Sequence, residues 1–451
     1  MLNSNNSFNK TLLRLSIPIM IQQLFTAGLG MVDLMLVGQL GDNSVAAVGL
    51  ATQVYFILNL VYFGMTSGSA IFTAQFWGKN DTESIQKVLS LNLIANFALG
   101  FIFTLISQIA PQFILGLFSK DPNVIQLGSH FLKLYSIGFV FTGISYAIYA
   151  VLRSTENVKI PMFVGGAILT FNTILGYILI FGKIGLPALG INGAAIANST
   201  ARIFELILII IIVRIFSSSV IIKPAIVFPI KPEFIKRYLT TVLPVTINEL
   251  IWSVGISVYA SIYAHIGTSS FTAINISSTI ENLAFVPFIG LGNACAIMIG
   301  KRIGAGELEE ALNYGKRILY ISFATAITMG ILILLNKGWI LDIYKISEIS
   351  RSYAHLILTI LSVSILVKST NMVLFIGIIR AGGDTRFGLF VEFATMWLYG
   401  VPAAFVAANL LHLQVFWVVI AVAFEEVIKL VLLYNRFRSK KWVHHLTHQV
   451  A

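Results

Sequence analysis

The feature that most constrains this chain is an internal repeat with a constant offset of 226 residues. The recurring residues, mostly proline, glycine and alanine, form the pairs Pro18/Pro244, Leu24/Leu250, Gly41/Gly267, Ala47/Ala273, Gly64/Gly290, Ala70/Ala296 and Gly78/Gly304. Arg153 and Arg380 then match after a shift of one residue. Because these residues stand in runs that are otherwise apolar, we interpret them as two copies of one membrane unit, an organisation typical of secondary transporters.

The composition indicates a membrane protein. Of the 451 residues, 57% are hydrophobic and 11% are charged, which is more apolar surface than a water-soluble fold can bury. A helix that spans a bilayer needs roughly 20 apolar residues. The chain offers twelve such runs, near 12–37, 44–77, 88–110, 130–152, 160–181, 190–214, 238–264, 270–300, 312–336, 353–379, 387–409 and 413–435. The predicted fold class is therefore an all-α polytopic membrane protein.

Six helices in each half make the two repeats parallel, because an even number returns the chain to the side from which it started. We expect an N-terminal six-helix bundle at 1–216 and a C-terminal one at 238–438. Residues 217–237 contain Pro224, Pro229 and Pro232, and they are interpreted as a cytoplasmic linker between the bundles. Residues 439–451 form a basic cytoplasmic tail.

Most of the positively charged residues lie in the predicted loops on one side of the membrane. The net charge is +11, and 21 of the 30 Lys and Arg residues fall on the side of the N-terminus, six on the other side and three within helices. Such a bias places both termini in the cytoplasm. It also explains the basic character of the chain, so that no nucleic-acid partner is needed.

The single cysteine and the N-terminal residues argue against disulfides, a cysteine-rich metal site and a cleavable signal. The one cysteine, Cys295, cannot form an internal disulfide or a cysteine-rich metal site. The polar N-terminal stretch precedes an apolar run that is too long for a cleavable signal. No metal or other cofactor is predicted.

A carboxylate in a spanning helix is costly, so its default interpretation is a functional site facing a cavity. Asp33 lies near the outer end of the first span and is either an interfacial residue or a titratable site, and we favour the second. Glu249 lies about two turns into the seventh span and aligns with Gln23 through the repeat. A carboxylate at that depth cannot easily reach the membrane surface, so Glu249 is predicted to be functional.

Glu281 and Asn282 align with Tyr55 and Phe56, so that their polarity is peculiar to the second half. Two interpretations stay open. Glu281 could face the same cavity as Glu249 and share a proton or a small cation with it. It could equally be tied structurally to Lys368.

Other charged residues in the spans favour local ion pairs. Arg202 and Glu205 are three residues apart and share a helix face, and Glu425 and Lys429 are four apart. Glu426, next to Glu425, is grouped with Glu425 and Lys429. Glu392 has no obvious partner and stays open.

Uncharged polar residues in the spans could coordinate an ion, bind substrate or join helices. They include Gln53, Asn172, Asn198, Asn248, Asn282 and Asn371. With Tyr55, we assign Gln53, Asn248, Asn282 and Asn371 to a substrate cleft. Aromatic residues make up 12% of the chain, and such side chains can hold flat cations without a fixed hydrogen-bond pattern.

Several motifs together resemble the multidrug and toxic-compound extrusion family. The chain opens with Pro18, then 32–41 (VDLMLVGQLG) and 46–51 (AAVGLA), continues with 190–197 (GINGAAIA) and ends with 380–385 (RAGGDT). Each motif alone is weak. Their order and spacing, from Leu12 to about Arg438, carry the resemblance.

The resemblance implies an antiporter that exports amphipathic, usually cationic compounds in exchange for Na⁺ or H⁺. It implies two six-helix bundles that form a V-shaped central cleft with alternating access. Asp33 resembles the coupling carboxylate of the N-terminal half, Asn172 matches an accompanying asparagine, and Asn198 falls near a small polar residue. Glu249 resembles the glutamate of the C-terminal half.

This sequence departs from the family pattern at two positions. Gly176 stands where some members have a second carboxylate, and Lys368 and Asn371 stand where others have an aspartate. The cation-coupling residues are therefore taken to be Asp33, Asn172, Asn198, Glu249 and Glu281. The mixture does not assign the coupling ion.

The motif at 380–385 could suggest phosphate binding, but no strand precedes it. We interpret it as a turn that caps helices and locks a cytoplasmic gate, with Arg153, Arg380 and Asp384 as gate residues.

Two rival classes are weighed. A flippase for lipid-linked oligosaccharides would need several cavity cations, and only Arg202 and Lys368 qualify. An enzyme would need catalytic motifs, and none is found. The expected partners are small amphipathic cations and membrane lipids, with a monomeric chain in a bacterial-type inner membrane.

Overall fold

A computed structural model describes residues 2–216 and 230–447. These residues are helical throughout apart from turns and one isolated bridge between Gly383 and Val443. The all-α prediction is therefore confirmed. Most of the expected linker at 217–237 and the last residues of the expected tail lie outside the described residues.

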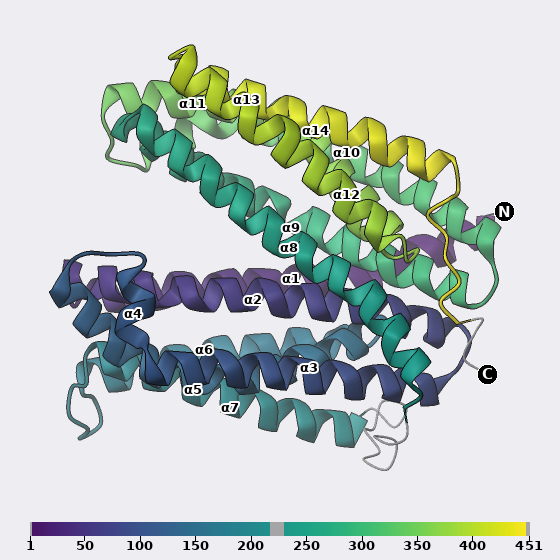
Figure 1. Cartoon of the computed structure of the whole chain (residues 1–451), viewed down its shortest axis with the longest axis horizontal. Coiled ribbons are helices and arrows are strands. Elements are labelled where there is room, and N and C mark those ends of the chain that lie inside the picture. Colours follow the sequence, from purple (N-terminus) through teal and green to yellow (C-terminus); the bar gives the residue numbers. More distant parts are fainter. Residues whose placement is uncertain (1, 217–229, 448–451) are drawn as a thin grey trace. The chain divides into compact units, whose positions relative to one another are not determined.

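Apart from one short helix, the helices of the first half are long enough to cross a bilayer (Figure 1). They are α1 (Leu2–Gly38), α2 (Asp42–Gly78), α3 (Thr82–Ile109), the short α4 (Pro111–Gly116), α5 (Pro122–Ser154), α6 (Lys159–Phe181) and α7 (Ile191–Phe216). The short α4 was not predicted.

The second half contains α8 (Pro232–Ile266), α9 (Thr268–Gly304), α10 (Leu308–Asp342), α11 (Glu348–Met372), α12 (Thr385–Thr395), α13 (Val401–Phe405) and α14 (Val415–Arg438). The π-helical segments η2 (Val373–Arg380), η3 (Met396–Gly400) and η4 (Val406–Leu410) continue α11, α12 and α13. The π-helical turns, which are rare and often mark functional sites, were not predicted.

Eleven helices among the described residues are long and apolar enough to cross a membrane. They correspond to the first eleven predicted spans. The twelfth prediction corresponds to α14, whose middle carries Glu425, Glu426 and Lys429. The prediction of about twelve spans therefore agrees with the structure, with α14 distinguished by charges that need partners inside the protein.

The chain divides into two compact units. The N-terminal unit is Pro18–Val242, and the C-terminal unit is Leu243–Ala451 together with Met1–Ile17. The predicted bundles instead counted 1–17 with the first half. The first residues group with the second half because the Phe8 ring packs against Tyr314, with centroids 4.9 Å apart, and under the Arg317 guanidinium.

Each unit is built around the same repeat element. In the N-terminal unit α5 packs against α2, α3 and α7, and in the C-terminal unit α11 packs against α9, α10 and α14. Close approach depends on glycine. A Cβ at Gly143 would overlap the Tyr62 ring and the Asn96 carbonyl, and one at Gly330 would overlap the Ser362 carbonyl.

The tail after α14 folds back on the turn between η2 and α12. Trp442 is fully buried, stacks on Phe437 and donates its indole N–H to the Phe437 carbonyl at 3.2 Å. A Cβ at Gly382 would overlap the Trp442 ring, and Gly383 has a φ of 93°. The His444 N–H donates to the Gly382 carbonyl at 2.7 Å. Gly382 and Gly383 thus allow the tail to pack against this turn.

Replacing Trp442 with alanine is expected to lower the free energy of unfolding by about 3–5 kcal/mol, as is usual when a large aromatic side chain is removed from a packed core. Thermal unfolding of the purified protein in detergent measures the loss. Trp339→Ala is the matched control, because Trp339 is 70% exposed and its removal is expected to change stability by less than about 0.5 kcal/mol. Equal effects of the two substitutions would contradict the packing role of Trp442.

Candidate functional site

Asp33 in the N-terminal unit is a carboxylate next to amide side chains. It lies on α1 and is partly buried. Asn172 on α6 is fully buried and donates its Nδ2–H to Asp33 Oδ1 at 2.8 Å. Asn198 on α7 lies close to Asp33, but its Nδ2–H donates to the Ala194 carbonyl at 3.1 Å. Asp33 forms no ion pair with any described residue.

The nearby arginine is already neutralised. Arg202 Nη1 lies 3.0 Å from Glu205 Oε2 on the same helix, as the three-residue spacing predicts. Glu205 also accepts the Tyr149 hydroxyl proton at 2.7 Å. The Arg202 guanidinium lies over the Tyr55 ring, 5.9 Å from its centroid. Arg202 acts on Asp33 only at longer range.

Glu249 in the C-terminal unit forms a buried ion pair. Arg380, at the end of η2, donates from Nη2 to Glu249 Oε1 on α8 at 2.8 Å. The two side chains are 5% and 10% exposed. Asn248, the preceding residue on α8, is also buried. The sequence predicts separate roles for these residues, cation coupling for Glu249 and a gate for Arg380, whereas the structure brings the two side chains together.

The N-terminal unit contains the uncharged counterpart of this pair. Arg153, at the end of α5, donates from Nη2 to Gln22 Oε1 on α1 at 2.9 Å. Arg153 is the repeat partner of Arg380, and Gln22 neighbours the repeat partner of Glu249. The repeat therefore contains a signal for the Arg380–Glu249 contact.

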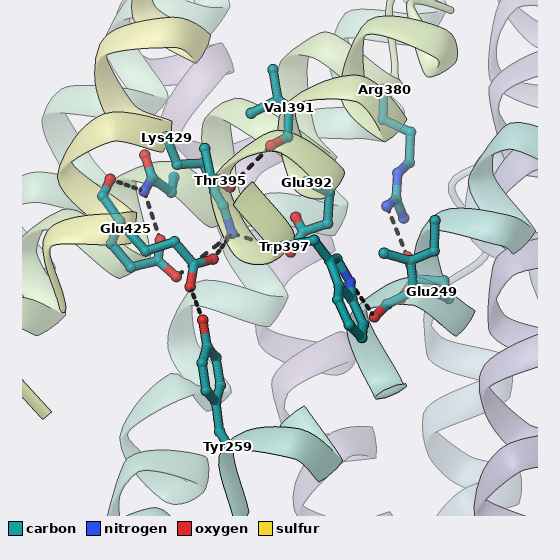
Figure 2. A network of polar contacts seen from close by, with 12 residues as sticks. Glu249, Tyr259, Arg380, Val391, Glu392, Thr395, Trp397, Glu425 and Lys429 are labelled. Atoms are coloured by element: carbon teal, nitrogen blue, oxygen red, sulfur yellow. Dashed lines mark hydrogen bonds and ion pairs between the residues drawn. The ribbon is translucent and has the colours of Figure 1, made fainter. Parts of the chain in front are cut away.

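Lys429 on α14 lies among three carboxylates, as Figure 2 shows for Glu392 and Glu425. Its Nζ is 3.2 Å from Glu392, 3.3 Å from Glu425 and 3.7 Å from Glu426. The i, i+4 pair with Glu425 was predicted. The contact with Glu392 on α12 supplies the partner that the sequence did not reveal.

Two further contacts extend this network. Lys368 on α11 lies 2.5 Å from Glu281 on α9, so the structural tie, one of two open interpretations of Glu281, is present. Asn371 donates its Nδ2–H to both the carboxylate and the main-chain carbonyl of Glu426, each at 2.7 Å. Asn371 therefore joins α11 to α14.

The remaining predicted cleft residues differ in exposure. Gln53 and Asn282 are exposed, whereas Asn248 is buried. Tyr55 is partly buried and packs against the rings of Tyr135 and Phe139. Among the described residues, no group of three or more His, Cys, Asp and Glu residues could hold a metal ion.

Asp384 lies in the turn that receives the tail. Its side chain does not cap α12, as a helix-capping turn would require. Instead, its Oδ2 accepts from Arg436 Nε on α14 at 2.6 Å, and its Oδ1 lies 3.6 Å from His444 Nε2. Asp384 therefore ties the turn to α14 and the tail.

The surroundings of Asp384 predict that its contribution to folding stability depends on pH. Burial raises the pKa of Asp384, but hydrogen bonds and positive charge from His444 and Arg436 outweigh it and hold the pKa below its usual value of 3.8. A depressed carboxyl pKa stabilises the folded state above the unfolded-state pKa, and this contribution disappears as the pH falls through the folded-state pKa. The stability difference between wild type and Asp384→Asn should be constant above about pH 5 and shrink below about pH 4. Melting temperatures from pH 7 to pH 3 test this, and a constant difference would contradict it.

A family model described as MatE matches the chain twice, over residues 18–178 and 244–406. The two matches start 226 residues apart, which is the offset of the sequence repeat. The chain belongs to this family of membrane transporters, and the resemblance seen in its motifs is confirmed.

Relatives that align with most of the chain are described as multidrug resistance proteins. A probable multidrug resistance protein NorM of Thermotoga maritima is 24% identical over 441 residues, covering 96% of this chain and 93% of that protein. A protein of the same name from Agrobacterium fabrum is 26% identical over 408 residues, covering 88% and 87%. A solved outward-facing multidrug resistance MATE family transporter has a TM-score of 0.86 at 20% identity, covering 96% of each chain. The last comparison shows the shared fold.

Proposed function

We propose that the protein is a secondary active multidrug exporter, which carries amphipathic organic cations out of the cell in antiport with Na⁺ or H⁺ by alternating access. The observation that carries the proposal is the state of Asp33. It is a carboxylate in a membrane helix that accepts a hydrogen bond from the Asn172 amide and that no described residue neutralises by an ion pair.

Such a group can exchange a coupling ion for the charge of a substrate. If the coupling ion and the organic cation compete for Asp33, binding of one releases the other. The relatives from Thermotoga maritima and Agrobacterium fabrum are both described as probable multidrug resistance proteins, which supports the substrate class. Asn172 and Asn198 supply oxygen and N–H groups that can adjust to either occupant.

The alternative, a flippase for lipid-linked oligosaccharides, finds less support in the side chains. A pyrophosphate group would need free cations in the spans. Of the two candidates, Arg202 is paired with Glu205, and Lys368 is paired with Glu281. Neither presents an uncompensated positive charge to an anionic lipid.

Location and partners complete the proposal. We place both termini in the cytoplasm of a bacterial-type inner membrane, because the positive residues concentrate in the loops of that side. The chain works as a monomer with membrane lipids around it, and Na⁺ or H⁺ is transported rather than held as a cofactor.

Transport by purified protein in liposomes tests the proposal. A fluorescent organic cation is loaded, and a pH gradient and a Na⁺ gradient are imposed in turn. Gradient-driven movement under either condition is the expected result, and it also identifies the ion. Movement under neither gradient, combined with translocation of a lipid-linked oligosaccharide, would replace the proposal by the flippase alternative.

A further inference from the structure

Four cations at one end of the C-terminal unit are exposed and have no counter-charge in the described part of the chain. Arg386 lies at the start of α12, Arg438 is the last residue of α14, and Lys440 and Lys441 follow it in the tail. None of the four forms an ion pair with another described residue. We call these four residues the basic end.

Contacts between α12 and α14 bring the basic end together. Asp384 Oδ2 accepts from Arg436 Nε at 2.6 Å, and the Arg436 guanidinium lies over the Phe387 ring, 4.6 Å from its centroid. Arg386 stands two residues after Asp384, and Arg438 stands two residues after Arg436. The start of α12 and the end of α14 therefore adjoin. Because Arg436 balances the charge of Asp384, this carboxylate does not neutralise the basic end.

An exposed apolar stripe on α14 leads to the basic end. Val427, Val431 and Tyr434 are exposed, and with Arg438 they follow spacings of four, three and four residues. Such spacings place side chains on one face of a helix. This stripe is the outer face of α14, since the buried face of the helix carries the charged network around Lys429.

A second exposed stripe on α12 leads to the same end. Arg386, Phe390 and Phe393 are exposed and follow spacings of four and three residues. The helix α12 packs against α14 within the C-terminal unit (Figure 1). Lipid tails are as apolar as these side chains, so that exposed apolar residues on a membrane helix contact acyl chains.

The order of these surfaces matches the order of groups in an anionic phospholipid, in which acyl chains lead to a phosphate. Arginine binds phosphate oxygens in pairs, and lysine binds them as a point charge. Clusters of roughly four to eight Lys and Arg residues next to a membrane helix are typical of sites for anionic lipids. A soluble phosphate compound could use the cations but would leave both apolar stripes without a role.

We propose that the basic end binds the headgroup phosphate of an anionic phospholipid, whose acyl chains lie along the exposed stripes of α12 and α14. The bound headgroup joins the start of α12, the end of α14 and the tail. Only the choice of leaflet, the cytoplasmic one, rests on the orientation proposed above. The lipid site itself goes beyond the proposed transport function and does not depend on it.

Lipid binding to the purified full-length protein tests the inference. The protein in nonionic detergent is offered an equal mixture of dioleoylphosphatidylglycerol and dioleoylphosphatidylcholine, and native mass spectrometry compares the amounts bound. Wild type is expected to prefer phosphatidylglycerol. Arg386→Gln/Arg438→Gln should lower this preference by about fivefold for each cation removed, as is typical of basic residues near anionic lipid.

The matched control is Arg14→Gln/Arg214→Gln, which removes the same charge from exposed arginines of α1 and α7 on the same predicted side of the membrane. It should keep the wild-type preference. Gel filtration and thermal unfolding show that the variants are folded. Equal binding of the two lipids by wild type would overturn the inference. An equal loss in both double variants would also overturn it, because it would show only a general effect of surface charge.

Two further measurements separate a lipid site from a phosphate site. An excess of inorganic phosphate should not displace bound phosphatidylglycerol, since phosphate cannot use the stripes. Phe390→Ala/Tyr434→Ala keeps all four cations and should weaken phosphatidylglycerol binding, whereas Tyr320→Ala/Phe323→Ala, which removes exposed rings from α10, should not. Displacement by phosphate, or unchanged binding by Phe390→Ala/Tyr434→Ala, would overturn the inference. Neither gradient nor organic cation is used, so these failures would leave the proposed function unaffected.

Discussion

Asp33→Asn is expected to uncouple transport while leaving the protein folded and inserted. The substitution keeps the size of the side chain and its hydrogen bond with Asn172 but removes the charge for which ion and substrate compete. Coupling free energies between two ligands usually correspond to about 5- to 150-fold changes in affinity. Gradient-driven accumulation of an organic cation in liposomes should fall by a factor in this range.

The matched control is Asp42→Asn, which makes the same chemical change at an exposed position at the start of α2. It should leave accumulation at the wild-type level. Gel filtration and thermal unfolding show whether both variants are folded. Wild-type accumulation by a folded Asp33→Asn variant would remove Asp33 from the coupling mechanism.

Glu249→Gln is expected to act mainly on stability, because it removes the carboxylate that pairs with the buried Arg380 guanidinium. Removal of one partner of a buried ion pair typically costs about 3–5 kcal/mol. Arg380→Met should cost a similar amount by leaving Glu249 unpaired. The double variant Glu249→Gln/Arg380→Met should recover most of the loss, since replacing both partners of such a pair is often nearly neutral.

Melting temperatures of the four proteins form a double-mutant cycle that measures the coupling between the residues. Transport by the stable double variant then shows whether Glu249 has a role beyond the ion pair. Additive losses in the cycle would contradict the pairing. Arg153→Met is an informative comparison, because Arg153 contacts the uncharged Gln22 and its loss leaves no buried carboxylate behind.

The helices could be predicted because apolar runs and the repeat mark them independently. The starts of several helices were placed too late. Asp81 accepts the Ser84 N–H at 3.0 Å and begins α3 six residues before the predicted start at 88. Asp121 caps α5 in the same way, well before 130. Polar N-terminal turns lie beyond the apolar run, so that hydropathy does not detect them.

The residues of the candidate site could be predicted in part. A carboxylate is costly in a membrane helix, and this cost identified Asp33, Glu249 and Glu281 individually as candidate functional residues. Pairs within one helix followed from spacing, as with Arg202 and Glu205. Partners on different helices could not be derived in this way, because Glu392 and Lys429 are 37 residues apart and meet only when α12 packs against α14.

The measurement that tests the central claim most directly is a reversal experiment in liposomes. The gradient of an organic cation is held fixed while the opposing H⁺ or Na⁺ gradient is varied until net substrate flux is zero. A coupled antiporter reverses at an ion gradient set by the substrate gradient and the exchange ratio, so the zero-flux point should move in proportion as the substrate gradient changes. A flux that vanishes only when the substrate gradient itself is zero, whatever the ion gradient, would contradict antiport.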